Sequence, residues 1–186
     1  TLRADDGVGI HANSHIMFAG AGTIGGATQL ASADAGTLLT GGTITRRVGL
    51  QPNQLSWTDA TRTAGGSGGF AALAGGLTLN FGSLNGGQGQ DLRWDAGGFV
   101  RGTDTLVFGS DAAEATGAVR LLNNIDLHGY NAKIAVYDNA GGTGDLALVS
   151  GNLTDGFVTA NSVNYAGQLY LTGQNTLLGI TVNNGL

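Results

Sequence analysis

Short apolar stretches separated by glycine-rich connections constrain the fold of this chain more than any other feature. Glycine supplies 35 of the 186 residues, and it gathers in segments such as 65–69, 85–89 and 141–144. The glycines have no three-residue period and proline occurs once, which excludes collagen. Apolar residues make up 41% of the chain and charged residues 11%, so disorder through low hydrophobicity is also excluded. The sequence therefore predicts an all-β protein.

Most of the apolar stretches are four to six residues long, and several alternate between apolar and polar residues. In Leu77–Phe81, both leucines and the phenylalanine fall on one face of a strand. The best helix candidate, 111–122, contains Gly117, and we expect a turn followed by a strand there. The predicted strands are His15–Phe18, Thr43–Val48, Gln54–Trp57, Leu77–Phe81, Asp91–Trp94, Thr105–Phe108, Ala118–Leu122, Ile125–Leu127, Lys133–Tyr137, Leu146–Val149, Gln168–Leu171 and Ile180–Asn183.

A degenerate repeat relates several of these strands. Similar apolar alternations, each closed by Gly or Asn, occur at 77–80, 104–109 and 168–173, and an Asn pair precedes Ile125. The spacing, roughly 20 to 30 residues, is that of coils stacked with loops of variable length. We therefore expect a β-helix of about eight coils, each rising about 4.8 Å. Its core is predicted to contain Leu77, Leu79, Phe81, Leu106, Phe108, Leu121, Ile125, Leu127, Ile134, Val136, Leu169, Leu171 and Val182.

The C-terminal part carries a more specific pattern. Residues 167–176 read Gly-Gln-Leu-Tyr-Leu-Thr-Gly-Gln-Asn-Thr, and Gly179, Thr181–Asn183 and Gly185 follow. This stretch resembles the autotransporter-associated β-strand repeat, with Leu177-Leu178 in place of the usual Tyr-Thr and a link to Val182 that is one residue short. Weaker similarity extends over about 40–186, whereas residues 1–40 match the repeat only in their general composition.

The resemblance implies a right-handed parallel β-helix that is exported to the bacterial cell surface. We expect residues 1–186 to form a single β-helix domain, in which 1–40 would supply the N-terminal coils. The last residues, 181–186, stop where another strand would begin, which favours a segment or subunit of a longer surface rod.

Charge and cysteine content exclude several classes of protein. The formal net charge is -5, there is a single lysine and the arginines are scattered, which argues against a nucleic-acid partner. No apolar run approaches the length of a membrane span. Cysteine is absent, so disulfides and thiolate metal sites are excluded, and export through an oxidising envelope is compatible with the composition.

Two glycine motifs are better explained as turns. Gly20–Gly25 fits G-x-G-x-x-G, but the glycines that follow oppose the helix that a dinucleotide site needs, and no acidic residue lies about 20 positions later. Gly86–Asp91 matches the start of a calcium-binding nonapeptide, but Arg93 occupies the position where that motif has an apolar residue. No tandem copy of this motif is present to complete an oxygen shell.

The polar and aromatic candidates are scattered. His11 and His15 have a helical metal-ligand spacing in a segment that reads as a strand. Arg101–Asp104 is not an integrin-type tripeptide, because Thr103 separates Gly102 from Asp104, and Asn152–Thr154 is a formal glycosylation sequon that we interpret as a turn. His128 has no obvious partner. Polysaccharide cleavage would need clustered carboxylates, and the candidates are Asp91, Asp95, Asp104, Asp126 and Asp138. Aromatic side chains could form a sugar-stacking surface, but we favour a place in the core or at its edges for Trp57, Trp94, Tyr130, Tyr137, Tyr165 and Tyr170.

These observations favour a non-catalytic structural protein of the bacterial surface. We expect a β-helical rod or head-to-tail fibre acting as scaffold or adhesin, with end-to-end self-association through the terminal coils and an unidentified glycan or host ligand as a possible partner. We predict no catalytic, cofactor or metal site. The alternative is a carbohydrate-binding or polysaccharide-cleaving β-helix protein.

Overall fold

The computed structural model describes residues 1–19, 35–139, 145–163 and 167–183. Within these ranges every regular element is a β-strand, so the prediction of an all-β protein is confirmed. The strands are β1 (Leu2–Arg3), β2 (Ile16–Met17), β3 (Gly36–Ile44), β4 (Leu55–Ser56), β5 (Gly68–Leu79), β6 (Leu92–Arg93), β7 (Thr105–Phe108), β8 (Val119–Leu121), β9 (Ile125–Asp126), β10 (Asn131–Tyr137), β11 (Leu146–Val149), β12 (Leu153–Thr154), β13 (Phe157–Val163), β14 (Gln168–Leu171) and β15 (Gly179–Asn183).

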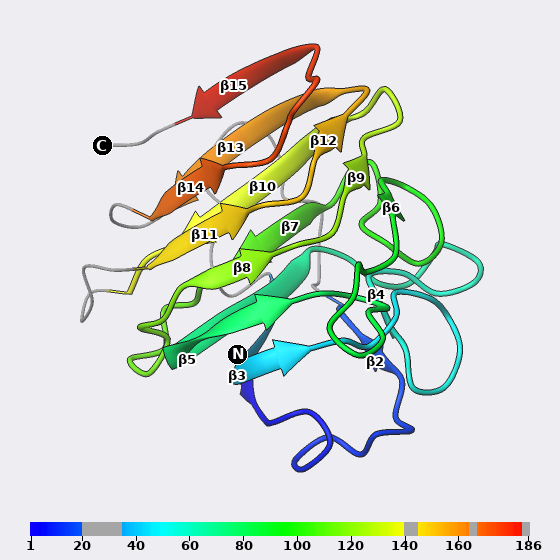
Figure 1. Ribbon diagram of the computed structural model, residues 1–186, viewed down its shortest axis with the longest axis vertical. Helices are drawn as coiled ribbons and strands as arrows, with labels where there is room; N and C mark the ends of the chain where they lie inside the picture. Colours follow the sequence, from blue (N-terminus) through cyan, green and yellow to red (C-terminus); the bar gives the residue numbers. More distant parts are fainter. Residues whose placement is uncertain (20–34, 140–144, 164–166, 184–186) are drawn as a thin grey trace.

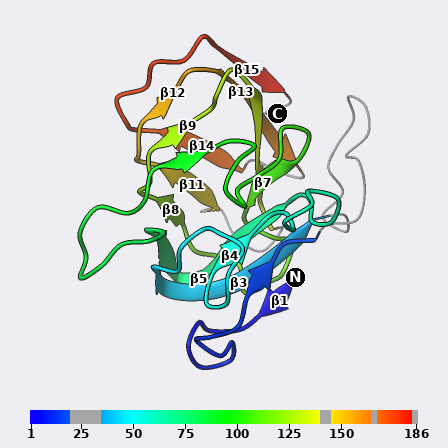
Figure 2. The same ribbon diagram turned by 90° about the vertical axis from the view of Figure 1, so that its right-hand side faces the viewer.

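The named strands pair in parallel, and they form columns that run along the molecule (Figure 1). The long column runs β1–β3–β5–β7–β10–β13–β15, so it contains seven strands. A second column branches from the far half of β5 and continues through β8, β11 and β14, and a third contains β6, β9 and β12. The resulting parallel sheet curls around a common interior (Figure 2).

The chain visits the columns in the same order along β7 to β15. β7 pairs with β10 and β10 with β13, while β8 pairs with β11 and β11 with β14. Contacts between the last two passes of the chain span 22 residues at three successive places, whereas contacts around Asn123 span 33 and 42 residues. The expected spacing therefore holds in the C-terminal part, and loops lengthen it near the N-terminus.

The predicted strands are located well, but glycine within strands was misread. β7, β11 and β14 begin and end where predicted, and 111–122 is a set of turns followed by β8. β1, β12, β13 and the first halves of β3 and β5 were not predicted. Gly68 and Gly69, interpreted as part of a connection, lie inside β5.

The reason for glycine at these positions is steric. A Cβ atom at Gly69 would lie 2.0 Å from the carbonyl oxygen of Val107, and one at Gly68 would lie 2.4 Å from that of Gly36. Real Cβ atoms do not approach backbone oxygens so closely, so only glycine allows the neighbouring strands to pass at this distance.

Gly69→Ala should therefore destabilise the protein, by about 1–3 kcal/mol or more, because the added methyl group forces β5 away from β7. The measurement is the free energy of unfolding in urea. Gly75→Ala in the same strand is the matched control, since a Cβ atom there would meet nothing within 4 Å, and we expect a change within about 0.5 kcal/mol. Equal stability of the two variants would contradict the steric explanation.

The predicted core is confirmed at ten of its thirteen positions. All ten residues from Leu77 to Val136 in the predicted set are at most 2% exposed. Leu169 and Leu171 are only partly buried, although they pack against the same cluster. Val182 was wrongly assigned to the core, because it is 71% exposed.

A cluster of aromatic side chains fills the N-terminal half of the interior, and it was not predicted as a unit. Trp57 lies 4.9 Å from Phe18 and 5.1 Å from Phe99, measured between ring centroids, and Phe99 in turn contacts Trp94. The indole N–H of Trp57 donates to the carbonyl oxygen of Gly68 at 2.8 Å, which satisfies its polar atom inside the core. Phe18 of this cluster packs directly against Gly68 of β5.

Amide side chains connect successive passes of the chain at its corners. Asn123 is buried, its Oδ1 accepts the backbone N–H of Phe81, and its Nδ2 donates to the carbonyl oxygens of Phe81 and Gln90. Asn152 and Asn175 each accept a backbone N–H from the neighbouring pass. These bonds satisfy backbone groups where the strands end, which explains why Asn recurs beside the apolar stretches.

Candidate functional site

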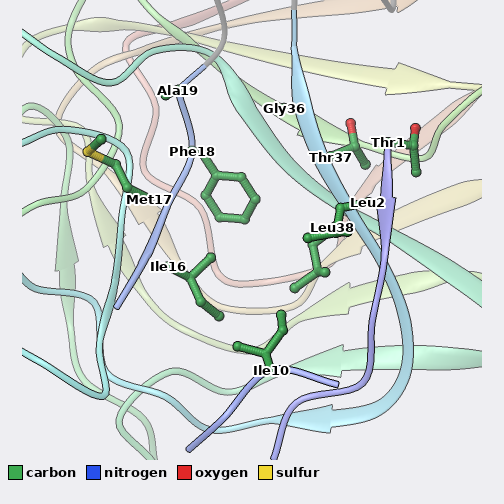
Figure 3. A pocket seen from close by; sticks show the side chains of 10 residues that line it. All are labelled: Thr1, Leu2, Ile10, Ile16, Met17, Phe18, Ala19, Gly36, Thr37 and Leu38. Atoms are coloured by element: carbon green, nitrogen blue, oxygen red, sulfur yellow. The ribbon is translucent and has the colours of Figure 1, made fainter. Parts of the chain in front are cut away.

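The N-terminal end of the interior is open as a pocket (Figure 3). Its volume is about 390 Å³, and apolar side chains from Ile10, Ile16, Phe18 and Leu38 line it. Leu38 belongs to β3, the second strand of the long column, and Phe18 belongs to the aromatic cluster. The strands β1 and β2 border this pocket, and no other described strand covers this part of the core.

The segment between β1 and β2 covers another part of this end. The Arg46 side chain is buried and donates to Asp6 Oδ1 at 2.6 and 2.8 Å. The same guanidinium donates to the carbonyl oxygens of His11, Ala12 and Ser14. One buried arginine therefore fixes the path of 4–15 across the end, where apolar side chains of this segment pack against the core.

The C-terminal end exposes side chains that face the interior. Ile180 of β15 pairs in register with buried Val158, and Val182 pairs with Ala160. Because side chains alternate along a strand, Ile180 and Val182 point to the same side as Val158. They are nevertheless 57% and 71% exposed, since no described strand lies beyond β15. This geometry explains the wrong assignment of Val182 to the core.

The candidate carboxylates for polysaccharide cleavage are held by other polar groups. Asp95 forms an ion pair with Arg62 and accepts hydrogen bonds from the hydroxyl of Tyr130 and the N–H of Gly102, both at 2.8 Å. Burial opposes the charged form, but these hydrogen bonds together with Arg62 hold the pKa of Asp95 below its usual value. Asp104 forms an ion pair with Arg101.

These contacts describe a polar network that ties neighbouring loops together. Arg62 also reaches the carbonyl oxygen of Asp95, and Arg101 donates to the carbonyl oxygen of Arg62. Asp91, placed in the same predicted set, accepts a hydrogen bond from Asn124 at 3.1 Å. The lowered pKa makes Asp95 a poor general acid at neutral pH, and its contacts tie neighbouring loops together.

One group of side chains has the spacing of a metal site. Ligand atoms of Asp126, His128 and Asp155 lie within 4.8 Å of one another, and this is the one such group in the described part of the chain. Arg93 competes for it, because its Nη2 lies 2.6 Å from His128 Nδ1 and its Nε lies 3.6 Å from Asp126. Asp126-x-His128 was visible in the sequence, but Asp155 reaches it only through the pairing of β9 with β12.

The candidate aromatics separate into buried and exposed groups. Trp57, Trp94 and Tyr137 are buried, which excludes them from a sugar-stacking surface, whereas Tyr130 and Tyr170 are exposed. Tyr170 lies on β14 in the second column, whereas Tyr130 lies in the loop before β10 of the long column.

The remaining predicted candidates serve local structure. His11 accepts a hydrogen bond from the N–H of Asn13 and His15 contacts Ser56, so the two histidines serve different elements. Asn152 of the sequon lies at a corner and accepts the backbone N–H of Gln174, but Leu153 and Thr154 form β12, so the interpretation of the sequon as a turn was wrong. In the nonapeptide-like segment, Asn85 and Gly86 both have positive φ, which is the geometry of a tight turn. Gly20–Gly25 and Tyr165 lie outside the described residues.

No helix among the described residues is long and apolar enough to cross a membrane. Comparison with known protein families, with curated proteins and with solved structures finds no match to this chain.

Proposed function

We propose that this chain is a right-handed parallel β-helix with a structural, non-catalytic role in a rod or fibre exported to the bacterial cell surface. The observation that carries the proposal is the correspondence between the two ends of the long column. The column ends in exposed inward-facing side chains on β15, and it begins beside an apolar pocket.

The β-helix assignment is supported by the repeated path of the strands. The chain passes from the long column to the second and third columns and returns to the long column. Hydrogen bonds between the last two passes join residues that are 22 positions apart in the sequence. Asparagine bonds at the corners join one pass to the next, as a stack of related coils requires. The surface location and the export rest on the similarity of 167–185 to the autotransporter-associated repeat.

The register of the long column supports end-to-end association. Val182 heads a row of paired residues that runs through Ala160, Ile134, Leu106 and Gly68 to Gly36. Gly36 lines the N-terminal pocket. β1 covers β3 at Leu38 and Leu39 and leaves its edge at Gly36 and Thr37 uncovered. If β15 of one copy continues the column in the same register over this uncovered edge of β3 in the next, Val182 is placed over the pocket and its side chain is removed from water.

The segment 4–15 limits how the copies meet. Since Arg46 holds this segment across part of the end, the contact uses the open pocket and the edge of β3 at Gly36 and Thr37 that β1 leaves uncovered. Parallel pairing at every step makes the contact heterologous, so the assembly grows as an open fibre.

Replacing Ile180 and Val182 by lysine should abolish end-to-end association, because two charges would have to enter an apolar contact. The measurements are electron microscopy and light-scattering mass of the 186-residue chain over a range of concentrations. We expect filaments or concentration-dependent growth for the unmodified chain and monomers for Ile180→Lys/Val182→Lys.

Leu84→Lys is the matched control, since Leu84 is 82% exposed in the loop between β5 and β6 and does not line the N-terminal pocket. It should associate like the unmodified chain. A monodisperse monomer at all concentrations for the unmodified chain would refute the fibre, and equal inhibition by Leu84→Lys would show that the association is not through β15.

A further inference from the structure

Two buried aspartates flank the connection between β10 and β11. Asp138 directly follows β10 and is 8% exposed, and Asp145 directly precedes β11 and is 5% exposed. Burial and a side-chain hydrogen bond to Asp138 are both among the causes that raise the pKa of Asp145. Two carboxyl groups can form such a bond only when one of them carries a proton, because two carboxylates are acceptors alone.

Among the described residues, no cationic side chain is among the influences on Asp145 that could replace this proton. The influences on its pKa are burial, the N–H of Asn139, and the hydrogen bond and charge of Asp138. The flanking strands β7 and β13 contain no ionisable side chain, and next to β11 the strands β8 and β14 carry Arg120 and Tyr170, both exposed. The neighbouring segment 111–117 adds only two acidic residues, Asp111 and Glu114.

The pair is connected to that segment through Asn139. The backbone N–H of Asn139 donates to Asp145 Oδ2 at 2.8 Å, and its side-chain amide donates to the carbonyl oxygens of Ala115 at 2.6 Å and Ala112 at 3.3 Å. Ala115 is buried against Leu39 and Ala71, in a small apolar cluster outside the main core. Asn139 therefore connects Asp145 to the middle of segment 111–117, whose last residue, Gly117, is bonded to Ala72 of β5.

We propose that Asp138 and Asp145 form a proton-sharing latch that fastens segment 111–117 to the end of β10 in mildly acidic conditions and loosens it at neutral pH. When the shared proton leaves, two buried negative charges repel each other and the contact between the carboxyl groups is lost. Asn139 then moves with Asp145, and the bonds to the Ala112 and Ala115 carbonyl oxygens weaken. This device is independent of the fibre contact, which lies at the ends of the long column.

The pH dependence follows from the direction of the shift. Burial, with Asp138, raises the pKa of Asp145 from 3.8 to about 6. Between these values the folded protein binds more protons than the unfolded chain, so stability falls as the pH rises. The contribution is fully present below pH 3.8 and is lost by the time the pH has passed about 6.

The test is the melting temperature of the full chain across this pH window. We expect it to fall by roughly 3–5 °C per pH unit in the unmodified protein, and to change much less in Asp145→Asn, which keeps a neutral hydrogen-bonding group. Glu114→Gln is the matched control, because Glu114 is an exposed carboxylate on the fastened segment, and it should retain the full pH dependence. An unmodified protein without this decrease, or an Asp145→Asn variant that keeps it, would overturn the proposal.

If the Asp145→Asn variant does not fold, a second measurement on the unmodified protein tests the proposal. Carboxyl ¹³C resonances of the unmodified protein should include a group that titrates near pH 6, together with a change in the amide resonance of Ala115 over the same range. Carboxyl midpoints that all lie in the usual range for aspartate would overturn the latch. Millimolar Ca²⁺ that restores the melting temperature above the window would also overturn it, since the pair would then hold a cation instead of a proton.

Discussion

Ile134→Asp is expected to lower the free energy of unfolding by about 3–5 kcal/mol, because it buries an unpaired charge in the interior. Ile134 is fully buried in β10, between Leu106 of β7 and Ala160 of β13 in the same row. Solvent does not reach this side chain, and the strands on both sides prevent the aspartate from turning outward. Urea unfolding followed by circular dichroism gives the measurement.

Val182→Asp is the matched control for this substitution. Val182 occupies the same row and points to the same side as Ile134, but it is 71% exposed. At concentrations where the chain is monomeric we expect a loss below about 1 kcal/mol. A large loss at Val182 together with a small one at Ile134 would mean that burial does not decrease toward the C-terminal end.

Asn123→Ala is expected to lower the free energy of unfolding by about 2–4 kcal/mol. The substitution removes three hydrogen bonds of a buried side chain and leaves the N–H of Phe81 without the acceptor that Asn123 provides. An unsatisfied buried donor costs about 1–3 kcal/mol, and the cavity left by the amide adds to this. The same urea experiment measures the change.

Asn131→Ala provides the comparison on the exposed face. Asn131 begins β10, is exposed, and accepts one side-chain hydrogen bond from Thr159 at 2.8 Å. We expect a change within about 0.5 kcal/mol. If both asparagine variants lose the same stability, the amide bonds at the corners are not what joins the successive passes of the chain.

The candidate polar sites illustrate how chain order conceals proximity. Asp95 and Tyr130 are 35 residues apart and Arg62 and Asp95 are 33 apart, yet they form one network. Asp155 joins the group around Asp126 only because β12 lies beside β9. A degenerate repeat does not fix loop lengths, and without the loop lengths the register between passes cannot be calculated. The burial of Asp138 and Asp145 was likewise not visible in the sequence, although the two residues lie close together there.

The sequence by itself determined the all-β class and most of the inward-facing positions, because alternation places every second side chain on one face whatever the neighbouring strands are. Leu77, Leu106 and Ile134 follow from that rule alone. Only the tertiary structure decided which inward positions are covered. Ile180 and Val182 obey the same alternation and remain exposed, because burial depends on a neighbouring strand on both sides and β15 has one described neighbour. The glycines of β5 were decided in the same way, since the carbonyl oxygens that exclude a Cβ atom at Gly68 and Gly69 come from strands distant in the sequence.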